Sequence, residues 1–186
     1  MKKFELTDEF VTNVFGHKLF RIKALVAFGD VEKGELGGFI EKEDNLSHDD
    51  NAWVYGNAWV SGNAQVSGNA QVFGDARVFG DARVSGNAWV SGNARVFGNA
   101  QVFGNADYAV VAGFGRYTTT FFRCKDKILR VQCGCFYGDL AQFREIVKKT
   151  HGDSKYAKEY LAIADLMELH FSDKCGGEQM NDGKIY

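Results

Sequence analysis

Residues 51–104 read NAWVYG NAWVSG NAQVSG NAQVFG DARVFG DARVSG NAWVSG NARVFG NAQVFG, nine copies of one six-residue unit without a break. In an extended segment alternate side chains take opposite faces, so the Ala and Val of each unit point one way and the residues flanking Val point the other. Gly and Asn or Asp tolerate unusual backbone angles and suit corners. The repeat therefore predicts a solenoid of short strands joined by corners.

An α-helix is excluded for this segment, because a helix needs a period of 3.6 residues and tolerates few glycines. The pattern resembles the hexapeptide repeat of left-handed β-helices, in which an aliphatic residue is followed four places on by a small one, as in Val60 and Ala64. In that family three hexapeptides make one triangular coil. The resemblance implies a mainly β fold with three regular coils over residues 51–106.

Stacking with a period of 18 residues sorts the outward side chains of the repeat onto three faces. The first face carries Trp53, Tyr55, Gln71, Phe73, Trp89 and Ser91; the second carries Trp59, Ser61, Arg77, Phe79, Arg95 and Phe97; the third carries Gln65, Ser67, Arg83, Ser85, Gln101 and Phe103. The coil interior cannot accept rings of this size. We therefore expect the C-terminal helices, a second copy of the chain or a partner protein to cover the first two faces.

Residues 1–50 are predicted to form an N-terminal cap with a degenerate first coil. Ile40 and Leu46 are six residues apart, as in the repeat, and an insertion near Asp49 and Asp50 precedes Val54. Residues 18–28 alternate well enough to predict a strand. A cap is expected because a solenoid needs its open end covered, and atypical terminal repeats do this.

Residues 107–186 are predicted to form a C-terminal module of a β-hairpin and a helical hairpin. Strands are expected at 108–112, 117–124 and 128–136, with a turn at 125–127 between the last two. Asp139 is a plausible N-cap of a helix to about Lys149, with Gly152 past its end. Ser154 is expected to cap a second helix to about Phe171. The residues after Ser172 are expected to form a polar tail.

The overall composition is that of an ordinary globular protein, with 45% hydrophobic residues, 22 glycines and no proline. The net charge of −2 provides no overall field that would gather nucleic acid. No apolar run approaches the roughly 18 residues of a membrane-spanning helix, and no apolar stretch follows Lys2 and Lys3 as in a signal peptide. We expect a cytoplasmic protein without membrane contact and with reduced cysteines.

Catalytic and metal-binding patterns are sparse. Left-handed β-helix proteins are often acyltransferases with a histidine as general base, which must reach the acceptor. The nine repeats contain no histidine and no inserted loop, so His48, beside the first coil, is the one candidate. Cys133 and Cys135 are expected on one side of a strand, with Cys124 on the partner strand, but a zinc site would need a second close pair. We predict no catalytic residue, no metal and no cofactor.

Arg77 and Arg95 are predicted to stack about 4.8 Å apart on the second face, with Phe79 and Phe97 alongside. Guanidinium groups interleaved with rings can bind single-stranded nucleic acid. The solenoid has only three arginines and two aspartates, however, and pairing of Arg77 and Arg83 with the preceding Asp75 and Asp81 is the simpler interpretation. We therefore expect no direct nucleic-acid ligand.

A protein partner is predicted instead, because Trp, Tyr and Arg are enriched where binding energy concentrates in interfaces. The predicted partner-binding residues are Trp53, Tyr55, Trp59, Phe73, Arg77, Phe79, Trp89, Arg95 and Phe97. A homo-oligomer, either a dimer or a trimer, is also expected, because trimers are common among the β-helix proteins that the repeat resembles and because the rings need cover.

The whole chain also resembles a set of uncharacterised proteins of bacteriophages and mobile elements. The segments that carry this resemblance are GDVEKGELGGFIEKEDNLS at 29–47, RYTTTFFRCKD at 116–126, and CGCFYGDLAQFREIVKKTHGDSKYAKEYLAIADLMELHF at 133–171. The setting implies a non-catalytic inhibitor of a host protein, such as a CRISPR–Cas or other defence complex, in the cytoplasm of the bacterial host. Two alternatives stay open: a sponge for a small nucleotide signal bound between subunits, and an acyltransferase that uses His48.

Overall fold

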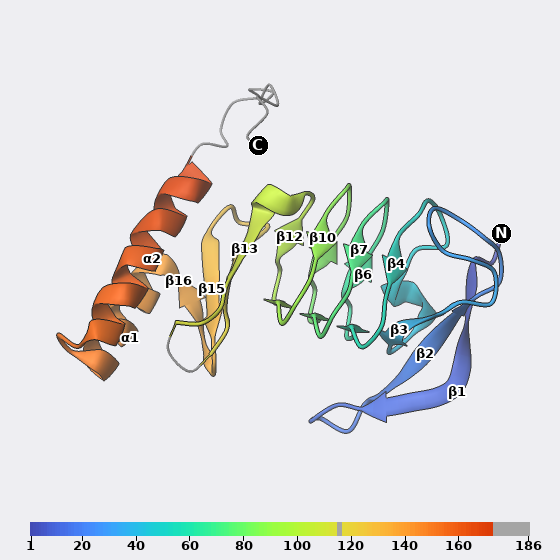
Figure 1. Cartoon of the computed structure of the whole chain (residues 1–186), viewed down its shortest axis with the longest axis horizontal. Helices are drawn as coiled ribbons and strands as arrows, with labels where there is room; N and C mark the ends of the chain where they lie inside the picture. The colour runs from blue at the N-terminus through green and yellow to red at the C-terminus, as the bar shows by residue number, and fades with distance from the viewer. Residues whose placement is uncertain (115–116, 173–186) are drawn as a thin grey trace.

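The computed structural model describes residues 1–114 and 117–172. An N-terminal hairpin, a β-solenoid, a four-stranded sheet and two helices follow one another along the long axis of the molecule (Figure 1). The expected mainly β fold is confirmed, and the solenoid has about four turns. The predicted polar tail after Ser172, with Cys175, lies outside the described residues.

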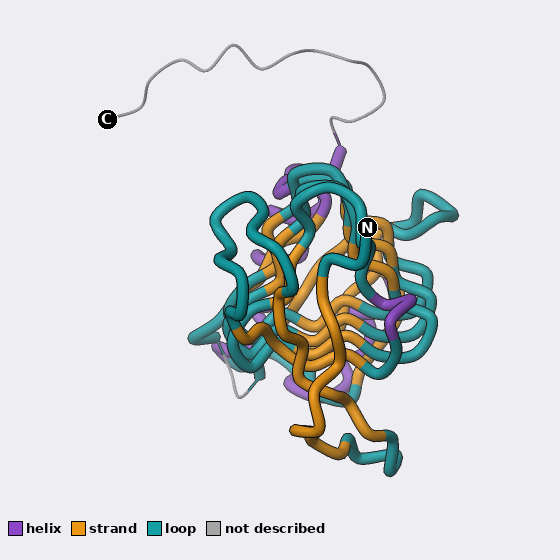
Figure 2. The backbone as a smooth tube through the Cα atoms, turned by 90° about the vertical axis from the view of Figure 1, so that its right-hand side faces the viewer, coloured by secondary structure: helices purple, strands orange, loops and turns teal. Residues whose placement is uncertain are grey.

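Each hexapeptide contributes one two-residue strand and one corner. The strands are β4 (Trp53–Val54), β5 (Trp59–Val60), β6 (Gln65–Val66), β7 (Gln71–Val72), β8 (Arg77–Val78), β9 (Arg83–Val84), β10 (Trp89–Val90), β11 (Arg95–Val96) and β12 (Gln101–Val102). Parallel pairing in steps of 18 residues forms the sheets β4–β7–β10, β5–β8–β11 and β6–β9–β12, so the three predicted faces are confirmed. Figure 2 shows these strands stacked in register.

The interior of the solenoid consists of the repeated Ala and Val side chains, which are almost fully buried from Ala52 to Val102. The corner glycines from Gly56 to Gly98 have φ between +57° and +75°, a left-handed conformation that other residues adopt at a cost. Corner asparagines stack between coils, since Asn51 Nδ2 donates to Asn69 Oδ1 at 3.2 Å. The backbone conformation of the corner therefore explains the repeated Gly, and the hydrogen bond between coils explains the repeated Asn.

The N-terminal segment extends the second face of the solenoid. Strands β1 (Phe4–Thr12) and β2 (Lys18–Ala24) form an antiparallel hairpin, and β2 pairs with β3 (Leu36–Ile40), giving the order β1-β2-β3-β5-β8-β11. The degenerate first coil is confirmed, because Ile40 pairs with Val60 and Leu46 with Val66, on either side of the 3-10 helix η1 (Glu43–Asn45). The predicted strand over 18–28 ends at Ala24.

The C-terminal sheet closes the other end of the solenoid. After the 3-10 helix η2 (Asn105–Asp107), the sheet has the order β13 (Tyr108–Val111), β14 (Thr119–Arg123), β15 (Leu129–Cys133) and β16 (Phe136–Asp139). Phe122 joins the core of the solenoid, whereas Phe121 joins a second core under the helices. One sheet therefore separates two hydrophobic cores.

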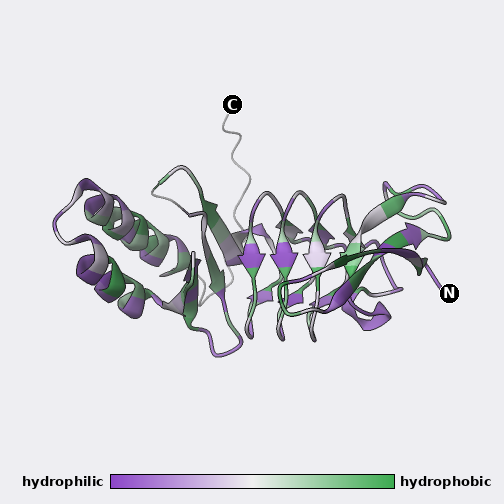
Figure 3. Ribbon diagram, turned by 90° about the horizontal axis from the view of Figure 1, so that it is seen from below, coloured by the Kyte–Doolittle hydropathy of each residue, from purple (hydrophilic) through white to green (hydrophobic). Residues whose placement is uncertain are grey.

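Helices α1 (Leu140–His151) and α2 (Lys155–Ser172) cover the far side of this sheet (Figures 1 and 3). The Asp139 N-cap is confirmed, since its side chain accepts a hydrogen bond from the Gln142 N–H, and Gly152 follows the end of α1. The helices do not lie on the aromatic faces of the solenoid. The expectation that they cover those faces is wrong, because their apolar stripes pack on the C-terminal sheet instead.

The predicted strand over 128–136 is broken by a turn at Gly134, whose φ is +58°. Cys133 is therefore the last residue of β15, whereas Cys135 lies in the turn before β16, and the prediction that they share one side of a strand is wrong. Cys135 is exposed and Cys133 half-buried, while burial raises the pKa of the Cys124 thiol to about 11. No helix among the described residues is long and apolar enough to cross a membrane.

Candidate functional site

Trp53 is the one predicted partner-binding residue that the structure places in the interior. Its side chain is 0% exposed, and the rings of Phe4 and Phe28 pack against it with centroid distances of 6.2 and 5.3 Å. The prediction for Trp53 is therefore wrong, because the N-terminal segment folds over this end of the first face. Tyr55, beside it, is half-buried, and desolvation raises the pKa of its hydroxyl.

The rest of the first face carries one prominent ring. Trp89 is 52% exposed, and Phe73 meets it edge to face at a centroid distance of 6.1 Å. The Tyr108 hydroxyl donates to the Trp89 carbonyl oxygen and so holds the start of the C-terminal sheet beside this strand. Trp89 and Phe73 are thus available to solvent, but no cavity described below includes them.

The second face combines rings and cations in register. Trp59 pairs with Arg77, and Arg77 pairs with Arg95 in the next coil. The Arg77 guanidinium carbon lies 4.4 Å from the centroid of the Trp59 ring, a cation–π contact. Phe79 and Phe97 stack alongside with centroids 4.7 Å apart. The predicted stacking of these side chains is confirmed.

The arginines of the solenoid have no carboxylate within 4.0 Å among the residues that the structure describes. The predicted pairing of Arg77 with Asp75 and of Arg83 with Asp81 is therefore wrong. The physical reason is visible at Asp81, whose Oδ1 accepts a hydrogen bond from Asn63 Nδ2 at 3.1 Å, along the corner and away from the face. Arg77 and Arg95 are exposed cations, and no carboxylate in the described part of the chain pairs with either of them.

The turn of the N-terminal hairpin stands beside the second face and closes one side of a cavity of about 370 Å³, here called the hairpin groove. Residues that line it include Phe15, Trp59, Arg77, Phe79 and Arg95. Val14 and Phe15 at the turn are 90% and 80% exposed. In the sequence, Val14 and Phe15 stand out as an apolar pair within a polar stretch. Their role could not be predicted, because the hairpin that places them at its turn was not predicted.

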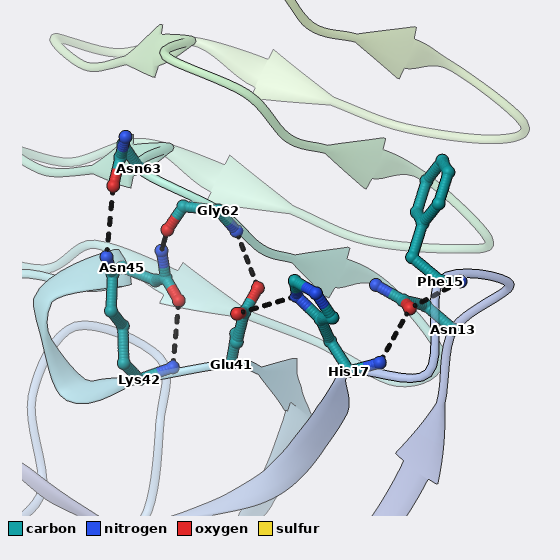
Figure 4. A network of polar contacts seen from close by, with 8 residues as sticks. All are labelled: Asn13, Phe15, His17, Glu41, Lys42, Asn45, Gly62 and Asn63. Carbon is teal, nitrogen blue, oxygen red and sulfur yellow. Dashed lines mark hydrogen bonds and ion pairs between the residues drawn. The ribbon is translucent and has the colours of Figure 1, made fainter.

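A network of hydrogen bonds holds the hairpin turn on the solenoid (Figure 4). Asn13 Oδ1 accepts from the backbone N–H groups of Phe15, at 2.9 Å, and His17, at 3.0 Å. His17 Nδ1 lies 3.0 Å from one oxygen of Glu41, whose other oxygen accepts from the Gly62 N–H at 2.7 Å. Because Glu41 joins the turn to a solenoid corner, the groove is preformed.

A second cavity, of about 330 Å³, lies where the solenoid meets the C-terminal sheet, and is here called the junction pocket. Arg77 and Arg95 line it as well, together with the corner residues Asp75 and Asn93. Its other wall comes from the C-terminal module, through Tyr117, Thr118, Gln132 and Gly134. The two arginines therefore lie between the two cavities and border both. Figure 3 shows hydrophilic strands on this side of the solenoid.

A third cavity, of about 560 Å³, lies within the C-terminal module. Its walls are mainly the rings of Tyr117, Phe136, Phe143 and Tyr160, with Cys135 at one side. Burial raises the pKa of Tyr160 to about 12, so its hydroxyl stays protonated and donates to the Phe114 carbonyl oxygen at 3.1 Å. Among the described residues that line this cavity there is no Asp, Glu, Lys or Arg, and His151 is the one imidazole.

His48 is held in place by contacts with the N-terminal segment and η1. Its Nδ1 accepts a hydrogen bond from the Lys3 N–H at 3.2 Å, its Nε2 lies 3.7 Å from Glu43 Oε2, and its ring stacks on Phe4 with centroids 4.2 Å apart. His48 lines none of the three cavities above. In the described part of the chain, no group of three or more His, Cys, Asp or Glu side chains could hold a metal ion.

Comparison with protein families matches only the solenoid. The family described as the YdcK beta solenoid repeat matches residues 52–68, 70–86, 76–92 and 88–106. Together with the stacked strands, this match establishes a β-solenoid repeat protein, and it leaves both ends of the chain uncovered. The comparison with curated proteins finds no match.

Proposed function

We propose that the protein is a non-catalytic binding protein that engages a partner protein at the hairpin groove. One observation carries the proposal: two exposed apolar side chains, Val14 and Phe15, stand beside two arginines that have no carboxylate partner. Rings and arginines supply most of the binding energy in many protein interfaces. Exposed apolar side chains at the tip of an ordered hairpin also favour a contact role over a purely structural one.

The chemistry of the groove selects a partner segment that presents a carboxylate next to apolar side chains. The carboxylate would pair with Arg77 or Arg95, and the apolar side chains would pack between Phe15 and Trp59. Opposite charges across an interface speed association and exclude wrong partners. The hydrogen bonds of Glu41 hold the turn before the partner arrives, so binding orders little of this chain.

The resemblance to phage and mobile-element proteins supports a host defence protein as this partner, within the bacterial host. Inhibition would then follow from occupation of the partner's surface, without chemistry on it. The dimer or trimer expected from the sequence stays a prediction, which light scattering on the purified protein tests.

Affinity capture with matched variants tests the proposal. The full chain, tagged, is used as bait in lysate of a bacterial host, beside a Val14→Ser, Phe15→Ser double variant and a Phe103→Ser control. Phe103 is 52% exposed on the third face and does not line the groove, so the control removes a comparable ring from a different face. We expect one protein to be captured by the wild type and the control and to be reduced at least about tenfold with the double variant. Equal capture by all three baits contradicts the proposal.

A further inference from the structure

The junction pocket contains a buried polar atom without a partner. Gln132 is 5% exposed, and its Nε2 donates to the Gly134 carbonyl oxygen, but its Oε1 makes no hydrogen bond. Among the described residues, this is the one unpaired buried side-chain atom whose residue lines the pocket. Since buried polar atoms are nearly always paired, such an atom calls for an explanation, and a ligand with an N–H or O–H group supplies one.

The position of Gln132 is set by the alternation of strand β15. Val131 faces the helices and belongs to their core, so the next residue along the strand faces the solenoid. Thr120 on β14 pairs with Gln132 and faces the same side of the sheet. The Thr120 hydroxyl accepts a hydrogen bond from the backbone N–H of Arg95 in the solenoid at 3.2 Å. The unpaired oxygen of Gln132 is therefore on the wall of the sheet that faces Arg95.

The opposite wall supplies two cations. Arg77 and Arg95 are directly paired residues of adjacent parallel strands, which lie about 4.8 Å apart. Like charges in such a pair repel each other unless an anion lies between them. A phosphate group offers several oxygens and accepts hydrogen bonds from two guanidinium groups at once. A single phosphate can therefore bridge both guanidinium groups of this pair.

The remaining walls suit a nucleoside. Tyr117 provides a half-exposed ring that packs on Gly134 and can stack with a base. Asp75 and Asn93, one coil apart at the same corner, provide acceptors and donors for sugar hydroxyls. A volume of about 330 Å³ lies at the lower end of the range of ligand pockets, which fits one nucleotide and leaves no room for a strand of nucleic acid.

We propose that the junction pocket binds a nucleoside monophosphate, with the phosphate on Arg77 and Arg95 and a base N–H group on Gln132 Oε1. The site lies within one chain and does not depend on the partner proposed above. Because the arginines border both cavities, the nucleotide and the partner compete for the same cations.

Titration calorimetry on the purified full chain at low salt tests this site. The probes are GMP, AMP, CMP and UMP, with ribose 5-phosphate and inorganic phosphate as comparisons. We expect at least one nucleotide to bind about tenfold tighter than ribose 5-phosphate, because only the nucleotide reaches Tyr117 and Gln132. Arg95→Gln and Gln132→Met should each weaken this binding about tenfold or more. Arg83→Gln removes the same charge on the third face and should leave the affinity within twofold.

Three results overturn the proposal: no nucleotide binds the folded wild type, all phosphates bind equally, or Arg83→Gln loses as much affinity as Arg95→Gln. Circular dichroism on each variant confirms that the variant is folded. The partner proposal is tested separately. Val14→Ser with Phe15→Ser should leave nucleotide affinity unchanged, and in lysate dialysed free of nucleotides Gln132→Met should leave partner capture unchanged.

Discussion

The second and third faces of the solenoid have the same backbone and different surroundings. Each contains three parallel repeat strands, and the central strand of each exposes an arginine, Arg77 on one face and Arg83 on the other. Arg83 is paired with Gln65 and Gln101 and lines none of the cavities described above. Arg77 lies between Trp59 and Arg95, with a hairpin at one end of its sheet and the C-terminal sheet at the other. The difference indicates that the site needs both the rings and arginines of this face and the two ends of the solenoid that enclose them.

The largest effect is expected at a corner glycine of the solenoid, and it tests whether contact between stacked coils fixes the backbone that the two faces share. Gly86 and Gly92 have nearly the same φ, +64° and +63°, but a Cβ at Gly86 would overlap the Phe103 carbonyl oxygen, whereas a Cβ at Gly92 meets nothing within 4 Å. Gly86→Ala should lower the free energy of unfolding by about 3 kcal/mol or more, and Gly92→Ala by about 1 kcal/mol. Urea denaturation measures both, and equal losses would show that contact between coils is not what restricts this corner.

A smaller effect is expected at the hairpin, which only the second face possesses. Glu41→Gln removes the charge that accepts hydrogen bonds from Gly62 and contacts His17. We expect a loss of about 1–2 kcal/mol, confined to the hairpin turn. Hydrogen exchange should therefore become faster for residues 10–18 and stay unchanged for the strands of the third face. Unchanged exchange in the turn would mean that Glu41 does not hold the groove in place.

The sequence predicts the arrangement of the repeat well, but it does not predict how the two ends of the chain pack against it. The period of 18 residues places Trp59, Arg77 and Arg95 on one face, because every unit has the same length and the same inward Ala and Val. Burial of Trp53 could not be predicted in this way, since Phe4 and Phe28 reach it through contacts that follow no period. Gln132 joins the site only because the sheet folds back on the solenoid, which local patterns do not encode.

The smallest expected effect concerns the charge repulsion on the second face. Arg77→Gln removes one of two like charges in register and should raise the free energy of unfolding by a few tenths of a kcal/mol at low salt. Its cation–π contact with Trp59 is lost at the same time, which offsets part of the gain. Arg83→Gln has no such neighbour and should change stability less. Thermal unfolding at low and high salt measures how far each variant's stability differs from that of the wild type. A difference from the wild type that depends more on salt for Arg83→Gln than for Arg77→Gln would contradict the expected order.

The most direct test compares the two central arginines as baits for the partner protein. Arg77→Gln and Arg83→Gln remove the same charge from equivalent strands of the same solenoid. Quantitative capture from one bacterial lysate should show at least about tenfold less partner with Arg77→Gln than with the wild type, and no more than a twofold change with Arg83→Gln. Equal loss in both variants, or no loss in either, would contradict the claim that the surroundings of the second face make it the binding site.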